Sequence, residues 1–393
     1  MQDKKELKKK VLVTGGGSGG HISAAQALIS AIQKEYIISK DNFLYVGGDL
    51  SMVGEKTGNS LEMKIFENES FNRKYIRAGK LQRSLDIGSL KLLFRTFLGF
   101  VDSYTIIKSF KPDIIVSTGG FVSVPVAIVG KLLNAKIFLH EQTAATGLAN
   151  KIIGKIADKV FVTYPSSEKY FSEKKTIHTG NLIRKDIFST NGSGNVVEAV
   201  KGMVTKQEQY PIIYISGGSL GSHIINQTVK ECLQMLTDNY QVILQTGDNK
   251  VFNDYENLQM EKKKLEKRNQ ENIFVVKYIK NNEIGFLFKN IDLFIGRSGA
   301  NTVYEMGVLE IPSIFIPIPW ATHNEQKKNA QVLEKLGLAT IIEEGELIGD
   351  TFVNKINTFL HKEKKVDEKE LKNIFTTDAS EKILKVLDLA NRS

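Results

Sequence analysis

Two glycine-rich segments, each between an apolar run and an amphipathic stretch, constrain the fold of this 393-residue chain more than any other feature. Residues 14–21 (TGGGSGGH) follow the apolar run 11–13, and residues 216–222 (SGGSLGS) follow the run 212–215. Glycine permits a tight turn between a strand and a helix, and the free N–H groups at the start of the helix attract an anion or a polar oxygen. Two such turns predict two similar α/β domains that face one cleft.

Apolar runs alternate with helical patterns along the whole chain, which is typical of parallel sheets wound by right-handed crossovers. The predicted fold class is therefore α/β, with two Rossmann-like domains and a closing C-terminal helix. The runs expected to form strands are 11–13, 43–46, 114–117, 137–139 and 160–163 in the first half, and 212–215, 242–245, 273–276, 292–295 and 313–316 in the second.

The flexible composition of residues 189–195 (STNGSGN) marks the expected boundary between the domains. We expect an N-terminal domain over 1–188, a linker region over 189–205, a C-terminal domain over 206–376 and a closing helix over 377–393. The apolar fraction of 41% is ample for two such cores.

Charge and apolar patterning limit the location and the partners of the protein. The charged segment 1–10 lacks the apolar stretch of a secretory signal, so we expect the protein to stay in the cytosol. The uncharged, largely apolar run 114–130 is shorter than the ~20 residues of a membrane span. The single cysteine, Cys232, excludes an intrachain disulfide and is expected to be buried.

The net charge of +9 favours an anionic partner, whether nucleic acid, anionic lipid or a phosphorylated substrate.

The first glycine turn is open to more than one interpretation. Residues 15–20 match G-x-G-x-x-G, and Asp49 follows the next strand, as the ribose-binding acid of a dinucleotide site would. His21 stands directly at the helix start, where its imidazole could act as an acid or a base. It could equally well cap the backbone.

Polar residues that follow two strands in the second half indicate a ligand site, because loops at the carboxyl ends of parallel strands line the ligand crevice. Glu305 comes one helical turn after Asn301, within the strand-turn-helix segment 296–305. Its carboxylate could accept both hydroxyls of a ribose, although a solvent-facing carboxylate would have the same pattern. The loop 317–330 supplies several side chains suited to sugar hydroxyls.

Seven motifs stand in the order found in the MurG family of bacterial glycosyltransferases (family 28), which this chain resembles over nearly its whole length. The resemblance implies the GT-B fold and transfer of N-acetylglucosamine from UDP-N-acetylglucosamine to lipid I, an undecaprenyl-linked acceptor. It implies attack by the MurNAc C4 hydroxyl with inversion, which yields lipid II in peptidoglycan synthesis. The motifs are 14–25, 117–123, 140–142, 179–184, 217–221, 297–305 and 326–329.

The resemblance also implies roles for individual residues. His21 and Glu141 are the candidate catalytic residues, and the family pattern places them with Asn150 on the acceptor side, in an N-terminal domain that would bind the lipid-linked acceptor. The C-terminal domain would bind the UDP-sugar. The candidates for UDP-N-acetylglucosamine binding are Ser18, Gly19, Gly20, His21, Asn150, Arg184, Ser219, Ile279, Arg297, Ala300, Asn301, Thr302, Glu305, Gln326 and Asn329.

Within that set, Glu305 would hold the uridine ribose and the backbone near Ile279 the uracil. Gln326 and Asn329 would bind the sugar hydroxyls. Ser219, with Arg184 and Arg297, would contact the diphosphate.

One position departs from the family pattern, which reads His-Glu-Gln-Asn where this chain has Thr143 in the last place. A hydroxyl cannot reproduce both the donor and the acceptor of an amide, so a sugar contact at Thr143 is put in question.

The reaction itself needs deprotonation of an acceptor hydroxyl and stabilisation of a departing diphosphate. Helix N-termini and arginines can perform the second task. No Asp-x-Asp pair flanks either glycine turn, and no His/Cys cluster has metal-ligand spacing. A reaction without a metal or another cofactor is therefore expected.

Residues 71–100, called the basic strip below, hold seven Lys and Arg residues against one acid, Asp86, among aromatic and aliphatic side chains. This mixture suits contact with anionic lipid, although a solvated basic face over a buried apolar stripe would have the same sequence pattern. With a lipid-linked acceptor implied, we expect peripheral attachment to the cytoplasmic face of the cell membrane and no nucleic-acid partner.

Two other functions compete with the transferase. A UDP-sugar epimerase on the same fold would share the UDP contacts without needing the basic strip. A dinucleotide-dependent oxidoreductase would use the first glycine turn but would leave the second turn and Glu305 unexplained.

Overall fold

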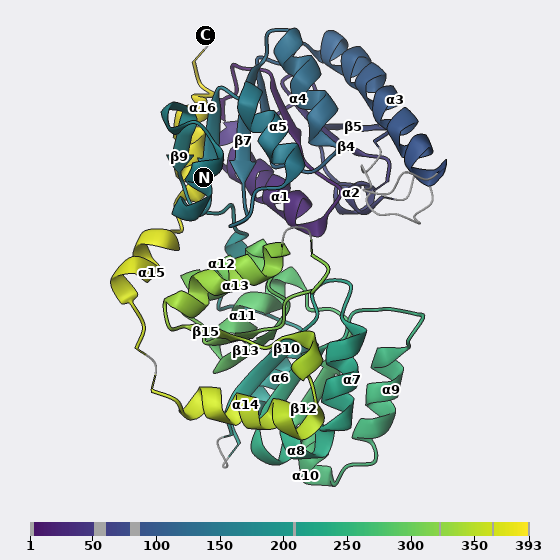
Figure 1. Cartoon of the computed structure of the whole chain (residues 1–393), viewed down its shortest axis with the longest axis vertical. Helices are drawn as coiled ribbons and strands as arrows, with labels where there is room; N and C mark the ends of the chain where they lie inside the picture. The colour runs from purple at the N-terminus through teal and green to yellow at the C-terminus, as the bar shows by residue number, and fades with distance from the viewer. Residues whose placement is uncertain are drawn as a thin grey trace. The chain divides into compact units, whose positions relative to one another are not determined.

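The computed structural model describes residues 4–50, 60–78, 87–206, 210–321, 324–363 and 365–391, without the side chains of 87–94. The chain forms two compact units (Figure 1). Unit 1 comprises Met1–Arg184 and Thr376–Ser393, and unit 2 comprises Lys185–Phe375.

The described part of unit 1 contains a seven-stranded sheet in which every pairing is parallel. Its strands are β2 (Val11–Thr14), β4 (Phe43–Gly48), β5 (Asn72–Ile76), β6 (Ile114–Ser117), β7 (Lys136–Glu141), β8 (Lys159–Val162) and β9 (Thr176–His178), in the spatial order β5-β4-β2-β6-β7-β8-β9. Two short strands, β1 (Lys5–Glu6) and β3 (Tyr36–Ile37), form a separate parallel pair.

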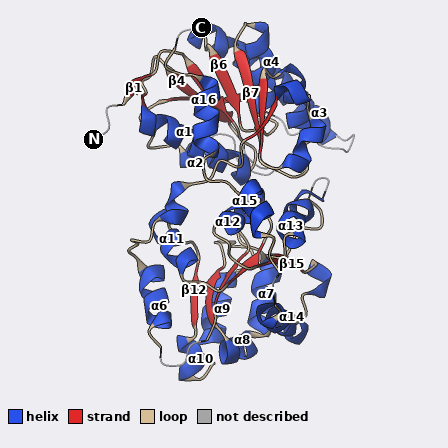
Figure 2. Cartoon of the chain, turned by 90° about the vertical axis from the view of Figure 1, so that its left-hand side faces the viewer, coloured by secondary structure: helices blue, strands red, loops and turns tan. Residues whose placement is uncertain are grey.

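Helices cover both faces of this sheet, so its central strands are apolar on both sides (Figure 2). Val11 and Val13 of β2 face a core that includes α1 and α16, whereas Leu12 faces the core that includes α3, α4 and α5. The helices are α1 (Gly19–Glu35), α2 (Leu61–Ile65), α3 (Ile87–Phe110), α4 (Ser123–Leu132), α5 (Leu148–Ile156) and α16 (Ala379–Leu387), with the 3₁₀ turns η1 (Pro165–Tyr170) and η2 (Glu173–Lys175).

Unit 2 repeats this architecture around a six-stranded parallel sheet in its described residues. The strands are β10 (Ile212–Ser216), β11 (Gln241–Gln245), β12 (Ile273–Val276), β13 (Leu293–Gly296), β14 (Ser313–Phe315) and β15 (Ala339–Ile341), in the spatial order β12-β11-β10-β13-β14-β15. The helices are α6 (Asn195–Val204), α7 (His223–Glu231), α8 (Leu233–Asn239), α9 (Asp254–Lys262), α10 (Lys267–Glu271), α11 (Asn281–Lys289), α12 (Ala300–Val308), α13 (Glu325–Lys335), α14 (Gly349–His361) and α15 (Glu368–Ile374), with the 3₁₀ turns η3 (Lys185–Phe188) and η5 (Glu344–Glu346).

Both sheets have the doubly wound strand order in which the first strand of the sheet is central and the chain reverses direction across it. The reversal lies between β2 and β6 in unit 1, and between β10 and β13 in unit 2. Ligands of such sheets bind beyond the carboxyl ends of the strands at this point. The two glycine turns follow β2 and β10, so each lies where its unit is expected to bind a ligand.

The division of the chain differs from the predicted boundaries. The units meet in sequence at Arg184 and Lys185, and α6 occupies 195–204 of the segment for which a linker was predicted. Four apolar residues bury one face of α6. These residues are Val196, Val197, Val200 and Met203. The glycine-rich composition of the residues just before α6 had indicated a linker instead.

The last described helix, α16, belongs to unit 1 (yellow in Figure 1). Ile383, Leu384 and Leu387 enter the same core as Val11 and Val13. The Lys9 ammonium donates to the Leu387 carbonyl at 3.3 Å, which fixes the helix end beside the first strands.

Two further expectations concern the burial of Cys232 and the length of the apolar helices. Cys232 is buried in the core of unit 2, and burial raises the pKa of its thiol to about 12, so it is a packing residue rather than a nucleophile. Within the residues described here, no helix is both long enough and apolar enough to span a bilayer.

Candidate functional site

In unit 1, three segments meet at the carbonyl oxygen of Thr118, just after β6. This oxygen accepts hydrogen bonds from Nδ1 of His21 at 2.8 Å and from Nε2 of Gln142 at 2.9 Å. The Thr118 hydroxyl donates to the backbone carbonyl of His21 at 2.8 Å. The start of α1 is thereby fastened to the turns that follow β6 and β7.

The bond to Thr118 determines which nitrogen of His21 carries the proton. A carbonyl oxygen can only accept, so Nδ1 carries the hydrogen and Nε2 of the neutral ring carries a lone pair. Burial lowers the pKa of His21, and the hydrogen bond to Thr118 opposes this shift. The imidazole is therefore neutral at neutral pH, with Nε2 able to accept a proton.

Two glycines after β6 make room for this imidazole. Gly119 and Gly120 have φ angles of +99° and +90°, which favour glycine. A β-carbon on Gly119 would lie 2.8 Å from Cε1 of His21 and 2.7 Å from Oδ1 of Asn150. The predicted site residues His21 and Asn150 thus lie against the same backbone atom.

Asn150 is oriented by Glu141, the second predicted catalytic residue. Its Nδ2 donates to Oε2 of Glu141 at 3.0 Å. Oδ1 of Asn150 is buried and receives no hydrogen bond from any residue that the structure describes, so it is available to a ligand. Burial raises the pKa of Glu141, while hydrogen bonds from Thr143 and Asn150 act in the opposite direction.

The roles of Thr118 and Gln142 were not predicted, although both lie within motifs used for the resemblance. The signal for these roles is the position of the two residues, because β6 and β7 follow β2 in succession across the sheet and their carboxyl ends share one edge of it.

The first glycine turn is occupied by a side chain from within unit 1. The Gly17 N–H donates to Oε1 of Glu62 at 2.8 Å. Asp49, the acid expected to bind a ribose in a dinucleotide site, instead pairs with Arg95 at 2.6 Å. The two features that favoured a dinucleotide-dependent oxidoreductase therefore have other partners in this chain.

Ser18, Gly19 and Gly20 form the N-terminal end of α1, a helix of 17 residues. Ser18 and Gly19 are exposed, and the Ser18 side chain makes no capping hydrogen bond. The positive end of the helix dipole at this position is suited to a negatively charged or polar ligand group.

In unit 2, the second glycine turn lies at the corresponding strand end. Gly218 and Gly221 have φ angles of +90° and +76°, and Ser219 between them is exposed. The turn is braced from β11, where Gln245 donates to the Gly218 carbonyl at 3.2 Å. The Tyr214 hydroxyl in turn donates to Oε1 of Gln245 at 2.9 Å.

Arg297 is buried beside this turn and already has several partners. Its Nη2 lies 2.5 Å from Oε1 of Glu344 and donates to the Ser222 hydroxyl at 2.7 Å. Its Nη1 donates to the Ile316 carbonyl at 3.0 Å. Arg297 thus joins the turns after β10, β13 and β14, and its contact with a diphosphate stays a prediction.

The remaining candidates of unit 2 lie mainly on α12 and α13. Ala300, Asn301 and Thr302 form the first turn of α12, and Glu305 is buried one turn later. On α13, Gln326 accepts from the Ile318 N–H at 3.1 Å through its Oε1. This bond leaves the Gln326 amide nitrogen as the group that can donate to a ligand.

Asn329 is fully buried, and its Nδ2 lies 3.4 Å from the Ser298 carbonyl, which joins α13 to the turn after β13.

The last two candidates lie outside α12 and α13. Ile279 is partly buried in the loop between β12 and α11, and Arg184 is the last residue of the first segment of unit 1.

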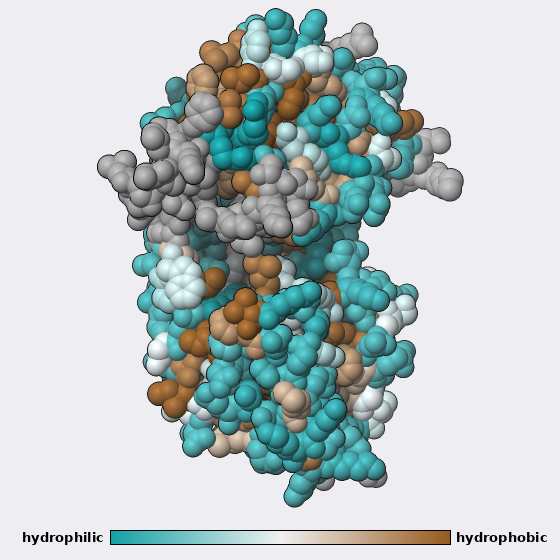
Figure 3. All heavy atoms as spheres, turned by 90° about the vertical axis from the view of Figure 1, so that its right-hand side faces the viewer, coloured by the Kyte–Doolittle hydropathy of each residue, from teal (hydrophilic) through white to brown (hydrophobic). Residues whose placement is uncertain are grey.

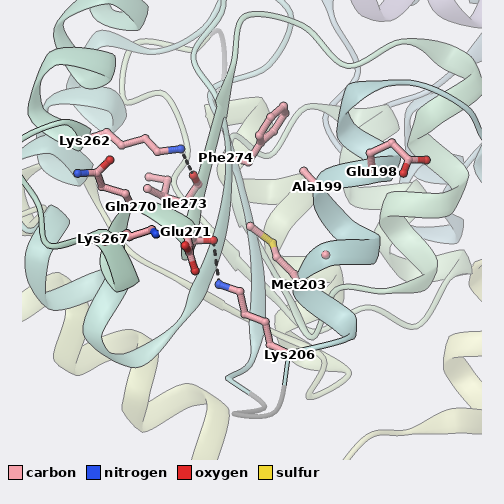
Figure 4. Close-up of a pocket in the computed structure, with 11 residues that line it drawn as sticks. Glu198, Ala199, Met203, Lys206, Lys262, Lys267, Gln270, Glu271, Ile273 and Phe274 are labelled. Atoms are coloured by element: carbon pink, nitrogen blue, oxygen red, sulfur yellow. Dashed lines mark hydrogen bonds between the residues drawn. The ribbon is translucent and has the colours of Figure 1, made fainter.

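A cavity of about 560 Å³ lies elsewhere in unit 2, and none of the predicted site residues lines it (Figure 4). It lies between α6 and α10, beside the start of β12. Lys262 and Lys206 donate there to the backbone carbonyls of Ile273 and Glu271, at 2.7 and 3.0 Å. This is the amino end of β12, opposite the sheet edge where ligands of parallel sheets bind.

The charges of the basic strip are partly neutralised by acids from outside it. Arg77 pairs with Asp102 at 2.6 Å, and Arg95 pairs with Asp49. A charge count within 71–100 could not include these acids. Residues 79–86 lie outside the described residues, as do the side chains of 87–94.

An exposed apolar row continues beyond the strip along α3. Phe97, Val101 and Tyr104 follow a spacing of four and three, which places them on one helical face, and they are 64%, 47% and 46% exposed. The Lys108 ammonium lies 5.3 Å from the centre of the Tyr104 ring. On the side of unit 1 that carries α3, apolar residues lie among hydrophilic ones (Figure 3).

Comparisons with known proteins agree with the geometry of both units. The glycosyltransferase family 28 N-terminal domain matches residues 11–162, and the glycosyltransferase family 28 C-terminal domain matches residues 212–387. The solved structure of Acinetobacter baumannii MurG has a TM-score of 0.67 at 20% identity and covers 98% of this chain and 99% of its own. A putative UDP-N-acetylglucosamine 2-epimerase from Listeria monocytogenes has a TM-score of 0.64 at 12% identity, over 98% and 96% of the two chains, which shows a shared fold.

Sequence similarity identifies the family. The UDP-N-acetylglucosamine–N-acetylmuramyl-(pentapeptide) pyrophosphoryl-undecaprenol N-acetylglucosamine transferase of Clostridium novyi is 34% identical over 386 residues, which cover 98% of this chain and 99% of the relative. The predicted pair of Rossmann-like α/β domains is confirmed, and it is the fold class of the GT-B glycosyltransferases. The chain is a glycosyltransferase that belongs to the MurG family within glycosyltransferase family 28.

Proposed function

We propose that this protein transfers N-acetylglucosamine from UDP-N-acetylglucosamine to the C4 hydroxyl of the N-acetylmuramyl group of lipid I. The observation that carries the chemistry is the hydrogen bond from Nδ1 of His21 to Thr118, because it leaves a lone pair on Nε2. The relative from C. novyi, whose name specifies this donor and an undecaprenyl-linked acceptor, supports the choice of substrates.

His21 is the proposed general base. As the acceptor oxygen forms a bond to C1 of the sugar, its proton passes to Nε2 of His21, and the bond from C1 to the diphosphate oxygen breaks. UDP leaves with the electron pair of that bond. A direct in-line displacement of this kind converts the α linkage of the donor into a β linkage.

Unit 2 is proposed to bind the donor. The N-termini of α7 and α12 begin at the two strand ends beside the chain reversal, where their dipoles favour the charge that develops on the diphosphate. Glu305 would accept the ribose hydroxyls, and the backbone near Ile279 would bind the uracil. Gln326 and Asn329 would bind the sugar, and Ser219 and Arg297 would contact the diphosphate. Arg184, which belongs to unit 1, is a further proposed contact of the diphosphate.

Unit 1 is proposed to bind the acceptor. Oδ1 of Asn150 offers a buried acceptor beside His21, and residues 18–20 offer the start of α1. The exposed row on α3 supports a further proposal, that the protein attaches peripherally to the cytoplasmic face of the cell membrane through α3 and the basic strip. Apolar side chains would enter the interface while cations such as Lys74 approach anionic headgroups.

The decisive experiment incubates the protein with labelled UDP-N-acetylglucosamine and a water-soluble lipid I analogue, with and without a chelator. We expect the label to appear in the analogue, in a β linkage to the C4 oxygen, at the same rate in both conditions. Conversion of UDP-N-acetylglucosamine without an acceptor would instead favour the epimerase. Transfer with retention of the α linkage would contradict the direct displacement.

A further inference from the structure

The hydroxyl of Thr143 lies within hydrogen-bond distance of two oxygens, one on Glu141 and one on Ala145, although it has a single hydrogen to give. Oε1 of Glu141 lies 2.8 Å from the Thr143 hydroxyl and accepts from the Thr143 N–H at 2.9 Å. The same hydroxyl lies 2.8 Å from the carbonyl oxygen of Ala145. All these groups are buried, so water cannot supply a missing donor cheaply.

Counting protons in this cluster shows what is missing. The Thr143 hydroxyl has one hydrogen and can donate it either to Glu141 or to Ala145. The Ala145 carbonyl has no hydrogen to give, and an ionised Glu141 has none either. If Glu141 were ionised, the two 2.8 Å contacts would have to share the single hydrogen of Thr143, or one of them would bring two oxygens together without a proton.

We infer that Glu141 is a neutral carboxylic acid at neutral pH, which donates from Oε1 to the Thr143 hydroxyl while that hydroxyl donates to the Ala145 carbonyl. Oε1 can still accept from the Thr143 N–H, and Oε2 can still accept from Nδ2 of Asn150. Every short contact of the cluster then has one donor and one acceptor.

The surroundings of Glu141 favour the neutral form. Glu141 is 1% exposed, and burial raises its pKa against the hydrogen bonds from Thr143, Asn150 and Thr146, with no charged group among the causes. Two histidines lie near this carboxyl group, His140, which precedes it on β7, and His21, on α1. Burial lowers the pKa of both, that of His140 to about 4, so neither supplies a positive charge.

A neutral Glu141 cannot take a proton from the acceptor, which leaves that role to His21. Glu141 is instead a positioning residue that acts through Asn150. By accepting from Nδ2, it fixes the amide orientation of Asn150 and leaves Oδ1 as the atom without a partner beside Gly119. Thr143, the position that departs from the family pattern, is the partner that allows Glu141 to keep its proton.

Infrared spectroscopy of the full-length protein without substrate tests the protonation state, whatever the function. At neutral pH we expect the carbonyl band of a protonated carboxylic acid, which disappears in Glu141→Gln. The band should shift in Thr143→Val, which removes the hydroxyl while keeping the shape, and should persist in Thr143→Ser. A parent spectrum without this band, or a band that survives in Glu141→Gln, would overturn the inference.

Turnover tests the positioning role, and this part rests on the proposed function. An amide reproduces the donation to the Thr143 hydroxyl and the acceptance from Nδ2 of Asn150, and loses only the acceptance from the Thr143 N–H. Glu141→Gln should therefore lower kcat by less than about tenfold and keep the pH profile, whereas Glu141→Leu should lower it by ~10² or more. Loss of a general base would make Glu141→Gln as inactive as Glu141→Leu, which would contradict the inference. If no protein transfers sugar while the band behaves as expected, the proposed function fails and the protonation state stands.

Discussion

Gly119 and His21 are packed so closely that a β-carbon at position 119 would lie 2.8 Å from Cε1 of the imidazole. Because the φ angle of Gly119 is +99°, an alanine there would be strained by its backbone as well as by this contact. The relationship makes the geometry of His21 depend on the absence of one methyl group.

We therefore expect Gly119→Ala to lower kcat by at least ~10-fold through displacement of His21, and to destabilise unit 1 by ~1–3 kcal/mol. Steady-state kinetics and urea unfolding measure the two effects. Gly147→Ala is the matched control, since Gly147 has a φ angle of −73° and open space at its β position. Full activity of Gly119→Ala would show that the imidazole tolerates displacement.

Replacement of His21 tests the general base directly. His21→Ala should lower turnover by ~10²–10⁴ while leaving UDP affinity nearly unchanged, since loss of a general base acts mainly on the transition state. Transfer assays and calorimetry with UDP separate the two quantities. In the parent, activity should fall as the pH drops through the lowered pKa of His21. A near-normal rate in His21→Ala would return this residue to a structural role.

The buried His140 predicts a pH dependence of stability. Burial lowers its pKa to about 4 in the folded state from 6.5, so between these values the unfolded chain binds a proton that the folded chain does not. Stability should therefore be unaffected by His140 above pH 6.5 and should decrease as the pH falls from 6.5 toward 4, by on the order of 3 kcal/mol.

Urea unfolding across this range, in the parent and in His140→Gln, measures the effect. The variant should lose less stability on acidification than the parent. His361→Gln, at an exposed position of α14, is the control and should behave like the parent. Equal pH slopes in parent and His140→Gln would refute the assignment.

Replacement of Glu305 tests the donor site most directly. If its carboxylate accepts the ribose hydroxyls, Glu305→Ala should weaken UDP binding by ~1.5–3 kcal/mol, the range for hydrogen bonds to a charged group. Calorimetry gives the affinity, and Glu334→Ala, which removes an exposed carboxylate from α13, controls for the change in net charge. Unchanged UDP affinity in a folded Glu305→Ala protein would remove Glu305 from the site.

Membrane attachment is predicted to have an apolar and an electrostatic part. Replacing Phe97 and Tyr104 with Ser should remove the binding to anionic vesicles that persists at high salt. Replacing Lys74 with Ser should weaken binding at low salt by roughly 1 kcal/mol. Ile348→Ser, which changes an exposed apolar residue of unit 2, is the control.

Co-sedimentation measures this binding, and activity on a water-soluble acceptor should be preserved in all of these variants. If the double variant of Phe97 and Tyr104 sediments with vesicles as well as the parent at high salt, α3 does not enter the membrane interface.

The sequence predicted features that depend on local pattern and missed those that depend on distant partners. The long apolar strands and both glycine turns were found because each is encoded by adjacent residues. β5 was missed because its cations resemble a surface strip, although it pairs with β4 as an edge strand. The pairing of Asp49 with Arg95, 46 residues away, carries no signal in either segment.

The same distinction holds within the site. His21 could be proposed from its place after a glycine turn, but its tautomer depends on Thr118, 97 residues later. Glu141 could be proposed as a catalytic residue from the resemblance, but its proton depends on how Thr143 folds back toward Ala145. Sequence pattern identifies such residues, whereas their protonation follows from contacts that only the folded chain makes.

The return of α16 to unit 1 has a consequence for how the protein is made. During synthesis, Val11 and Val13 leave the ribosome hundreds of residues before Ile383 and Leu384, which complete their core. Unit 2 is continuous and can finish folding while unit 1 still exposes the apolar groove that α16 will fill. The domain that begins the chain is thus the last to be completed, and a ribosome stalled before residue 376 leaves it open to aggregation and proteolysis.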